Sequence, residues 1–298
     1  MKRDNTLYVQ IVLGLGILIV LGIFVNNIAL NLARTGLGFS FSWLLSPASF
    51  ALAEHPLNYS ASDSYAWALF MGWLNSLKVI CVSLLLATFI GFSIGLARVG
   101  RNKLLSLLAA AYVTLIRQVP LLLQLMFWYF VGFLGMNDNL FLPFKDILYI
   151  SNQGINILSV TLSSEFSALL IGLSIFTGAY ISEVVRGGIN AVPLGQWEAF
   201  RSLGLSEGMG LYKVIIPQAL PAILPGLTSQ YLNLAKNSTL AIAVGYADIY
   251  AISDTVINQT GRAIEGFILL LLSFLFLNLI ISNSMEFINK LILTYQNR

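Results

Sequence analysis

The sequence is short of charged residues. Lys, Arg, Asp and Glu make up only 10% of its 298 residues, whereas hydrophobic side chains make up 57%. A soluble domain of this size has about 25% charged residues. The shortage excludes soluble enzymes and free nucleic-acid-binding proteins, and it predicts a chain that lies mostly in a membrane.

Cysteine and histidine are also scarce. Each occurs once, as Cys81 and His55. A single cysteine excludes an intramolecular disulfide and any site that needs several thiolates. A metal site built from several histidines is excluded in the same way, so we expect this chain to hold no metal ion.

What the sequence has is long apolar stretches. The hydrocarbon core of a bilayer is about 30 Å thick and takes roughly 20 helical residues to cross. Six stretches are long enough, and they run roughly over Val9–Leu30, Gly72–Ala97, Leu104–Leu134, Phe166–Val185, Gln218–Leu234 and Phe267–Ile288. Because the fifth is rich in proline, a broken or re-entrant helix is an alternative to a continuous one there. The sequence predicts an all-α polytopic membrane protein with about six transmembrane helices.

The basic residues predict how the chain is oriented, because positively charged loops stay in the cytoplasm. With the N-terminus inside, ten of the 16 Lys and Arg residues fall on the cytoplasmic side, three fall outside, and three lie within or beside spans. Both termini are then cytoplasmic. We expect residues 1–35 to form an anchor helix, since its apolar run exceeds that of a cleaved signal peptide. Residues 36–71 are expected to form an external loop, and residues 72–290 the main transmembrane domain.

The longest polar stretch on the predicted inner side covers residues 186–217, RGGINAVPLGQWEAFRSLGLSEGMGLYKVIIP. Glu198 lies in a first short helix, Gly204 stands where that helix would end, and Ser206 is suited to cap a second one. Pro217 would start the return into the membrane. The pattern predicts a protruding pair of short helices, and the alternative is a loop that only connects two spans.

This stretch resembles the EAA loop of ABC importer permeases, whose pattern is Glu-Ala-Ala, then Gly, then a hydrophobic segment ending in Pro. Here the pattern reads Glu198-Ala199-Phe200, Gly204 and Pro217, with Phe200 in place of the second Ala. The resemblance implies that the helix pair is a coupling element that docks in a groove of a separate ATPase subunit. Leu203 is expected among the docking residues.

The resemblance extends over most of the chain. From Gly72 to Ile288 it is similar to the polar amino-acid permeases of the histidine and glutamine type, with Arg117-Gln118-Val119-Pro120 where that family commonly has Arg-Gly-Thr-Pro. Stretches at 227–241 and 258–261 are most similar to the first permease subunit of general L-amino-acid transporters. The family implies a five-helix type I importer core over residues 72–290, preceded by the anchor helix and a periplasmic loop.

The family also implies a set of partners. These are a second, homologous permease subunit, two ATPase subunits, a periplasmic binding protein that delivers L-amino acids, and the lipid of a bacterial inner membrane, with no nucleic acid. The chain contains no G-x-x-x-x-G-K-[ST] phosphate loop. We therefore expect ATP and Mg²⁺ to be bound by the ATPase partners, and this chain to be neither an enzyme nor the holder of a cofactor.

Charged residues inside a membrane span are costly and usually face a partner or a substrate route. Arg117 is suited to bind the α-carboxylate of an amino acid, or alternatively to brace neighbouring helices. Glu183 is suited to receive an α-amino group, or to form a local ion pair with Arg186. The remaining residues predicted to line a substrate pathway are Gln124, Lys236, Asn237 and Ser238.

Two other classes of function compete with the importer. In a secondary transporter or channel the polar loop would be a connector and the intramembrane charges an ion relay, but Glu183 is the only strong intramembrane acid. An intramembrane enzyme would need a nucleophile or metal motif, and the sequence contains neither. Dependence of uptake on an ATPase separates the importer from the secondary transporter.

Overall fold

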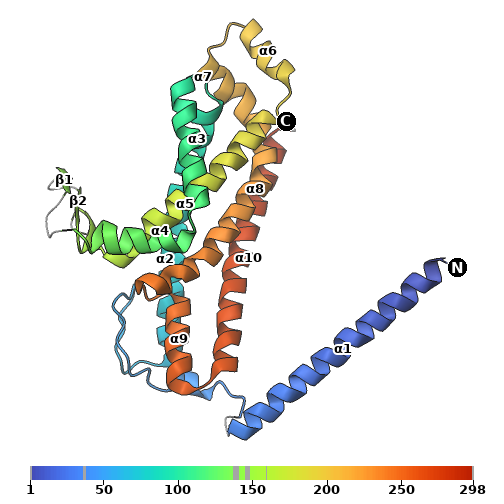
Figure 1. The fold of residues 1–298 in the computed structure, drawn as a ribbon, viewed down its shortest axis with the longest axis vertical. Coiled ribbons are helices and arrows are strands. Elements are labelled where there is room, and N and C mark those ends of the chain that lie inside the picture. The colour runs from blue at the N-terminus through green and yellow to red at the C-terminus, as the bar shows by residue number, and fades with distance from the viewer. Residues whose placement is uncertain (1, 36–37, 137–140, 145–147, 159, 297–298) are drawn as a thin grey trace.

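A computed structural model describes residues 2–35, 38–136, 141–144, 148–158 and 160–296. Five long helices form its framework: α1 (Lys2–Thr35), α2 (Tyr65–Val99), α5 (Ser164–Asn190), α8 (Ile216–Asn237) and α10 (Ala263–Gln296) (Figure 1). Each predicted span falls within one of them or within a bent helix pair. Residues 36 and 37, at the predicted boundary between anchor and loop, lie outside the described residues.

The bent pair replaces the third predicted span. Helix α3 (Lys103–Gln118) ends just before Pro120, and α4 (Leu121–Met126) continues as the π-helix η2 (Phe127–Phe133). The two arms meet at an angle of 102°. Pro120 has no backbone N–H, and its ring disfavours a helical conformation at the preceding residue, so the helix stops there. The predicted fold of about six membrane-crossing segments is confirmed, with this one sharply bent rather than straight.

The fifth segment is a continuous helix, although the sequence analysis also allowed a broken or re-entrant one. Helix α8 passes through Pro221 and Pro225 and ends at Asn237, and a 3-10 helix η4 (Ser238–Val244) follows it. Gly245 then takes a left-handed conformation (φ 78°), which ends η4, and α9 (Ile249–Thr260) follows. The regular helix thus ends beyond the predicted segment, and α9 is an element that the sequence analysis did not predict.

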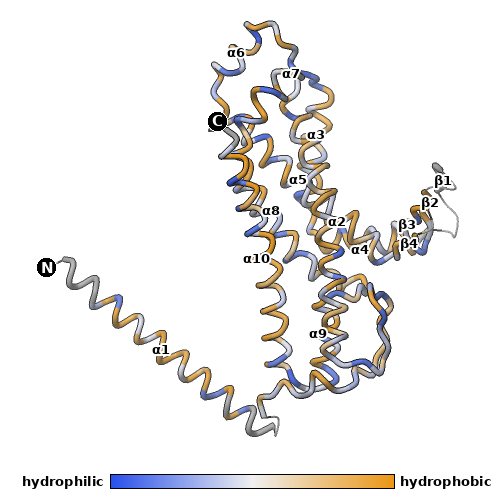
Figure 2. The backbone as a smooth tube through the Cα atoms, turned by 180° about the vertical axis from the view of Figure 1, so that it is seen from behind, coloured by the Kyte–Doolittle hydropathy of each residue, from blue (hydrophilic) through white to orange (hydrophobic). Residues whose placement is uncertain are grey.

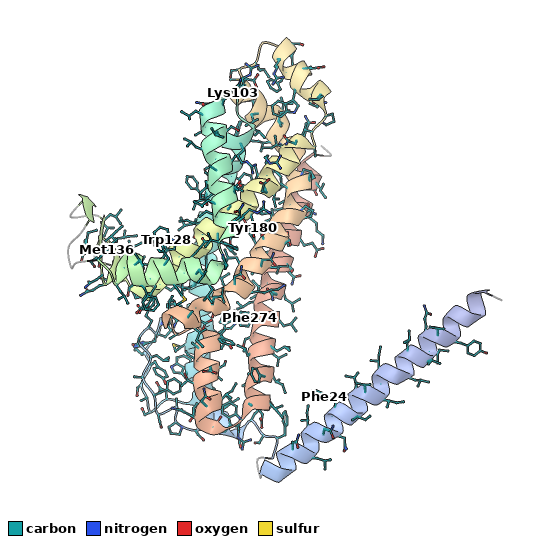
Figure 3. All side chains as sticks on the ribbon, viewed as in Figure 1. Phe24, Lys103, Trp128, Met136, Tyr180 and Phe274 are labelled. Carbon is teal, nitrogen blue, oxygen red and sulfur yellow. The ribbon has the colours of Figure 1, made fainter. Side chains whose placement is uncertain are left out.

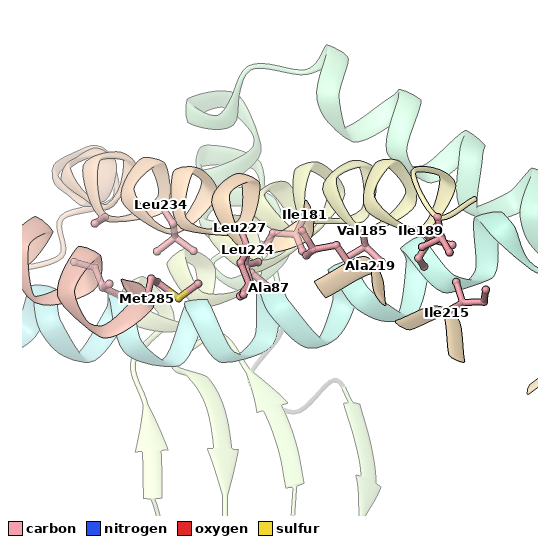
Figure 4. Packing of buried hydrophobic residues seen from close by; sticks show 14 of the residues in the cluster. Ala87, Ile181, Val185, Ile189, Ile215, Ala219, Leu224, Leu227, Leu234 and Met285 are labelled. Carbon is pink, nitrogen blue, oxygen red and sulfur yellow. The ribbon is translucent and has the colours of Figure 1, made fainter. Parts of the chain in front are cut away.

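The core lies where α2, α5, α8 and α10 meet (Figure 4). Helices α2 and α5 approach most closely at small residues. A Cβ added at Gly91 would lie 2.4 Å from Cγ2 of Ile181, and one added at Gly95 would lie 2.8 Å from Val185. Only glycine permits this contact, so the packing expected from a small-xxx-small pair is present.

The surface of the bundle suits a membrane. Helix α10 is mainly hydrophobic between its ends (Figure 2). Helix α1 extends away from the bundle (Figure 1), and no residue in its most apolar window, within Tyr8–Ile28, is buried. Exposed apolar side chains of this kind are expected to contact lipid, as in a membrane-spanning helix.

The remaining segments are the loop between α1 and α2, at the end away from α6, and a small sheet to one side near α4 (Figure 1). After α1, a short 3-10 helix η1 (Ser42–Leu45) buries Trp43 against Ala68 and Ile252. Glu54 in the same loop pairs with Lys78 of α2 at 3.7 Å. A small antiparallel sheet, in the order β1–β2–β3–β4, precedes α5 and was not predicted; its strands are Phe141–Phe144, Leu148–Ser151, Gly154–Ile157 and Val160–Leu162.

Candidate functional site

Two short helices protrude from one end of the bundle, as the sequence predicted (Figure 1). Helix α6 (Leu194–Ser202) is followed by Gly204 in the left-handed region (φ 71°), which is the conformation glycine favours at a helix end. Ser206 caps α7 (Glu207–Gly210), because its side-chain oxygen accepts a hydrogen bond from the Met209 N–H. A π-helix η3 (Leu211–Ile215) then leads into α8, whose first turn contains Pro217.

Phe200 holds the two helices together. It is 1% exposed, and it packs so closely on α7 that a Cβ added at Gly210 would lie 2.2 Å from the Phe200 ring. Ile215 and Ala219 extend the same buried cluster into α8. The bulky residue at the second Ala of the EAA pattern is therefore accommodated by a glycine ten positions later.

The outer face of α6 carries the other predicted docking residues. Glu198 and Ala199 are exposed, and Leu203 is 77% exposed at the end of the helix. Leu194 at the start of α6 is 78% exposed. Exposed leucines beside a carboxylate on a short, protruding helix form a surface suited to contact another protein.

Ion pairs of Glu207 also link the two short helices to each other and to the bundle. Glu207 of α7 accepts a hydrogen bond from Nε of Arg201 at 2.9 Å and also pairs with Arg101 at 2.9 Å. The hydrogen bond from Arg201 lowers the pKa of Glu207 below its usual value. Glu207 is thus ionised at neutral pH and connects α6, α7 and the segment between α2 and α3.

A second charged cluster lies inside the bundle and joins three helices. Glu183 of α5 accepts hydrogen bonds from Arg98 of α2 and from Arg186 one turn away, the latter at 2.9 Å. Arg117, at the end of α3, reaches the same carboxylate at 3.6 Å. The sequence predicted both the Glu183–Arg186 pair and a bracing role for Arg117 as alternatives, and in this structure Glu183 and Arg117 face each other.

Arg117 also contacts Tyr180, one of the residues that line a polar cavity. Its guanidinium lies 4.8 Å from the centre of the Tyr180 ring, and Tyr180 lies in the middle of the bundle (Figure 3). The cavity measures about 330 Å³ and is formed between α5 and α8; its lining residues are Phe176, Thr177, Tyr180, Gln230, Asn233, Lys236 and Asn237. Polar amides, a phenol and one ammonium group around a space of this size are suited to hold a small polar molecule.

The predicted pathway residues fall into two groups. Lys236 and Asn237 line the cavity. Ser238 is buried, and its hydroxyl donates to the Ala235 carbonyl at 2.8 Å. Gln124 is also buried, and its amide donates to two carbonyls of the bent segment, those of Ile116 and Val119, both at 2.9 Å. In this structure Gln124 and Ser238 satisfy backbone groups beside helix ends and do not border the cavity.

Other cavity residues were missed by sequence reasoning. Gln230 and Asn233 stand three residues apart on α8, and Lys236 and Asn237 continue the same face. A polar stripe at this spacing in an otherwise apolar helix is the signal that could have identified them. Tyr180 and Phe176 have no such signal, because an aromatic residue in an apolar helix is most often a packing residue.

Both sites lie within a region that matches a known family. The profile of the binding-protein-dependent transport system inner membrane component family matches residues 87–294, which is well over half of the chain. The chain belongs to this family. Membership in this inner-membrane family and the apolar helices together make it a multi-pass protein of a bacterial inner membrane.

Several relatives of this permease family cover most of the chain. The putative amino-acid ABC transporter permease protein YhdX of Escherichia coli is 32% identical over 94% of this chain and 92% of its own length. The general L-amino acid transport system permease protein AapQ of Rhizobium johnstonii is 32% identical over 80% of each chain. The family resemblance identified from the sequence is confirmed.

Solved structures share the fold. A chain of an amino acid ABC transporter crystallised with histidines is 29% identical, with a TM-score of 0.60 over 76% of this chain and 94% of that one. A chain of the methionine ABC transporter MetNI in an inward-facing conformation is 20% identical, also with a TM-score of 0.60. The second likeness concerns the fold alone.

Proposed function

We propose that this chain is one permease subunit of an ATP-driven importer of L-amino acids. It would work with a second permease subunit, two ATPase subunits that bind ATP and Mg²⁺, and a periplasmic binding protein that delivers the substrate. The relatives with amino-acid transport in their names support the substrate class. The predicted orientation, with both termini and α6 in the cytoplasm, belongs to this proposal.

The observation that carries the proposal is the polar cavity between α5 and α8. An amino acid presents a carboxylate and an ammonium group at fixed separation, so its site needs a cation and several hydrogen-bonding groups. Lys236 and the amides of Gln230, Asn233 and Asn237 supply such groups. Arg117 lies over the ring of Tyr180, which lines the cavity, and makes a longer contact with Glu183.

Arg117 makes the longest contact with Glu183 of the three arginines in this cluster. Its side chain is 42% exposed and its contact with Glu183 is 3.6 Å, whereas Arg98 and Arg186 form closer hydrogen bonds to the same carboxylate. Moving the Arg117 guanidinium toward a substrate carboxylate leaves Glu183 paired with two arginines. The proposal is that Arg117 binds the α-carboxylate as substrate passes, and braces α3 against α5 otherwise.

The test is amino-acid-stimulated ATPase activity of the whole complex, reconstituted in lipid with its binding protein. Losing a charge-assisted contact costs about 1.5–3 kcal/mol, so Arg117→Ala should raise the half-saturating amino-acid concentration roughly ten- to a hundredfold. Lys290→Ala is the control, because Lys290 is an exposed cation on α10 that pairs with Glu286, away from the cavity. A lowered melting temperature with unchanged half-saturation would identify Arg117 as a brace only.

Coupling is tested in the same preparation with Glu198→Arg. Reversing this exposed charge on α6 should release the ATPase subunits or abolish stimulation, while leaving α6 folded because Glu198 makes no buried contact. Unchanged stimulation would refute docking through α6. Uptake driven by an ion gradient with no ATPase subunit bound would refute the importer itself and favour a secondary transporter.

A further inference from the structure

A second cavity, distinct from the one proposed for substrate, lies at the end of the bundle beneath α6. It measures about 390 Å³ and is formed by the ends of α2 and α5 together with α6; its lining residues are Arg98, Val99, Arg186, Asn190, Val192, Leu194, Trp197 and Arg201. Three of these side chains are guanidinium groups from three helices. None of the described residues that line it is acidic, so the cavity is strongly cationic.

The nearby acids do not balance this charge. Glu183 is the carboxylate for Arg98, Arg186 and Arg117 together, and Glu207 is the carboxylate for Arg201 and Arg101. Five guanidinium groups therefore share these two carboxylates and the exposed Glu198, which lies near Arg201 on α6. The excess positive charge lies at the cavity, because Arg98, Arg186 and Arg201 all line it.

The Arg98 guanidinium has N–H donors that are free to bind a ligand. Its side chain is only 16% exposed, yet among the contacts of the described residues it donates one hydrogen bond, from Nη1 to Glu183. A guanidinium has five N–H donors, so Arg98 keeps donors that can face the cavity it lines. An oxyanion in the cavity would accept from these donors in the forked geometry that arginine favours.

We propose that this cavity binds a phosphate-type oxyanion, and that its source is the headgroup of an anionic phospholipid. The end of α2 places Arg98 close to where a membrane-spanning helix meets the headgroups. Trp197 and the exposed Leu194 on α6 supply an aromatic and an apolar contact beside the basic groups. Basic pockets between helices at the cytoplasmic surface are typical sites for anionic headgroups. The bound phosphate would neutralise the arginines of α2, α5 and α6 that line the cavity.

The test uses a variant that adds a charge and removes no arginine. Asn190→Asp places a carboxylate in the cavity with almost no change of shape, and among the described residues the exposed Asn190 side chain has no hydrogen bond to lose. Asn190→Ser controls for loss of the amide. Arg101→Gln controls for net charge, because Arg101 is 74% exposed and does not line the cavity.

The purified complex in neutral detergent is titrated with short-chain phosphatidylglycerol, phosphatidylcholine or inorganic phosphate, while its thermal unfolding is followed. Binding to the folded state raises the midpoint of unfolding. Phosphatidylglycerol should raise it in the wild type, in Asn190→Ser and in Arg101→Gln, and phosphatidylcholine should not. In Asn190→Asp the apparent affinity should fall about tenfold or more, because the added charge lies beside the anion.

Each other outcome has a defined meaning. If inorganic phosphate gives the same shift and the same sensitivity to Asn190→Asp, the site is confirmed with a free anion as its source. If phosphatidylglycerol gives no shift, or a shift that Asn190→Asp does not change, the proposal is refuted. If Asn190→Asp instead releases the ATPase subunits from the complex without any lipid effect, the cavity belongs to that protein interface and the proposal is also refuted. Amino-acid transport itself decides none of these outcomes, so failure here is distinct from failure of the importer.

Discussion

The contact between Phe200 and Gly210 permits a sharp test of how the protruding helix pair is built. Phe200 is 1% exposed, and its ring occupies the space where a side chain at Gly210 would begin, 2.2 Å from the added Cβ. Phe200→Ala restores the common Glu-Ala-Ala pattern of the family but empties this space. Truncating a fully buried phenylalanine costs about 3–5 kcal/mol.

The reciprocal change overfills the same space. Gly210→Ala adds a methyl group that Phe200 must move to admit, at a cost of about 1–3 kcal/mol, offset by about 1 kcal/mol because alanine favours a helix. In the double variant the new methyl group occupies part of the space that the ring left. We therefore expect the two effects to be non-additive, with the double variant more stable than the sum by about 1–2 kcal/mol.

The assay must report on the helix pair rather than on the whole bundle. Amide hydrogen exchange in peptides covering residues 194–215, measured in the assembled complex, gives the free energy of local opening. Since about 1.4 kcal/mol is a factor of ten, Phe200→Ala should speed exchange by roughly a hundredfold or more, and Gly210→Ala should partly reverse that effect. Strictly additive changes, or no change on Phe200→Ala, would refute the role given to this contact.

Three further predictions concern other parts of the chain. Gly91→Ala should lower the melting temperature of the complex, because its Cβ would lie 2.4 Å from Ile181 and overpacking costs about 1–3 kcal/mol; Gly187→Ala, which meets nothing within 4 Å, is the control. Gln124→Leu should also lower it, since two backbone carbonyls at the bend lose their donor at about 1–3 kcal/mol each. The pKa of Glu207 is lowered in the fold, so its link between α6 and α7 should hold at neutral pH and weaken as the pH falls below about 4.5. The weakening should appear as faster amide exchange in residues 194–215. A constant exchange rate, after correction for the intrinsic pH dependence of exchange, would contradict this prediction.

The parts of the fold that were predictable depend on local chemistry. Gly204 and Ser206 specify a helix end and a helix start within three residues of each other, and the structure has both. Pro120 predicts a kink in the third apolar stretch, since proline removes a hydrogen bond wherever it occurs in a helix. The angle of 102° was not predictable, because it depends on how the second arm packs on α5 and on the Gln124 amide that satisfies the bend.

The parts that were missed depend on residues distant in sequence. Arg98 reaches Glu183 across 85 positions, and no local pattern distinguishes it from the basic residues that simply mark a cytoplasmic loop. The small sheet of residues 141–162 has strands of three or four residues, which is too short for an alternating pattern to emerge. A polar stripe was present on α8, yet only the tertiary structure shows that it faces Tyr180 rather than lipid.

The polar cavity between α5 and α8 and the protruding helix pair are connected by these same two helices. Helix α5 contributes Tyr180 to the cavity and runs on without interruption to Asn190, next to α6, over about 15 Å at 1.5 Å per residue. Helix α8 begins at the protruding pair and ends at the cavity with Asn237. The buried cluster that contains Phe200 and Ile215 continues along both helices (Figure 4). If packed helices move as rigid bodies, the proposed docking of a partner on α6 would shift α5 against α8 and change the walls of the cavity.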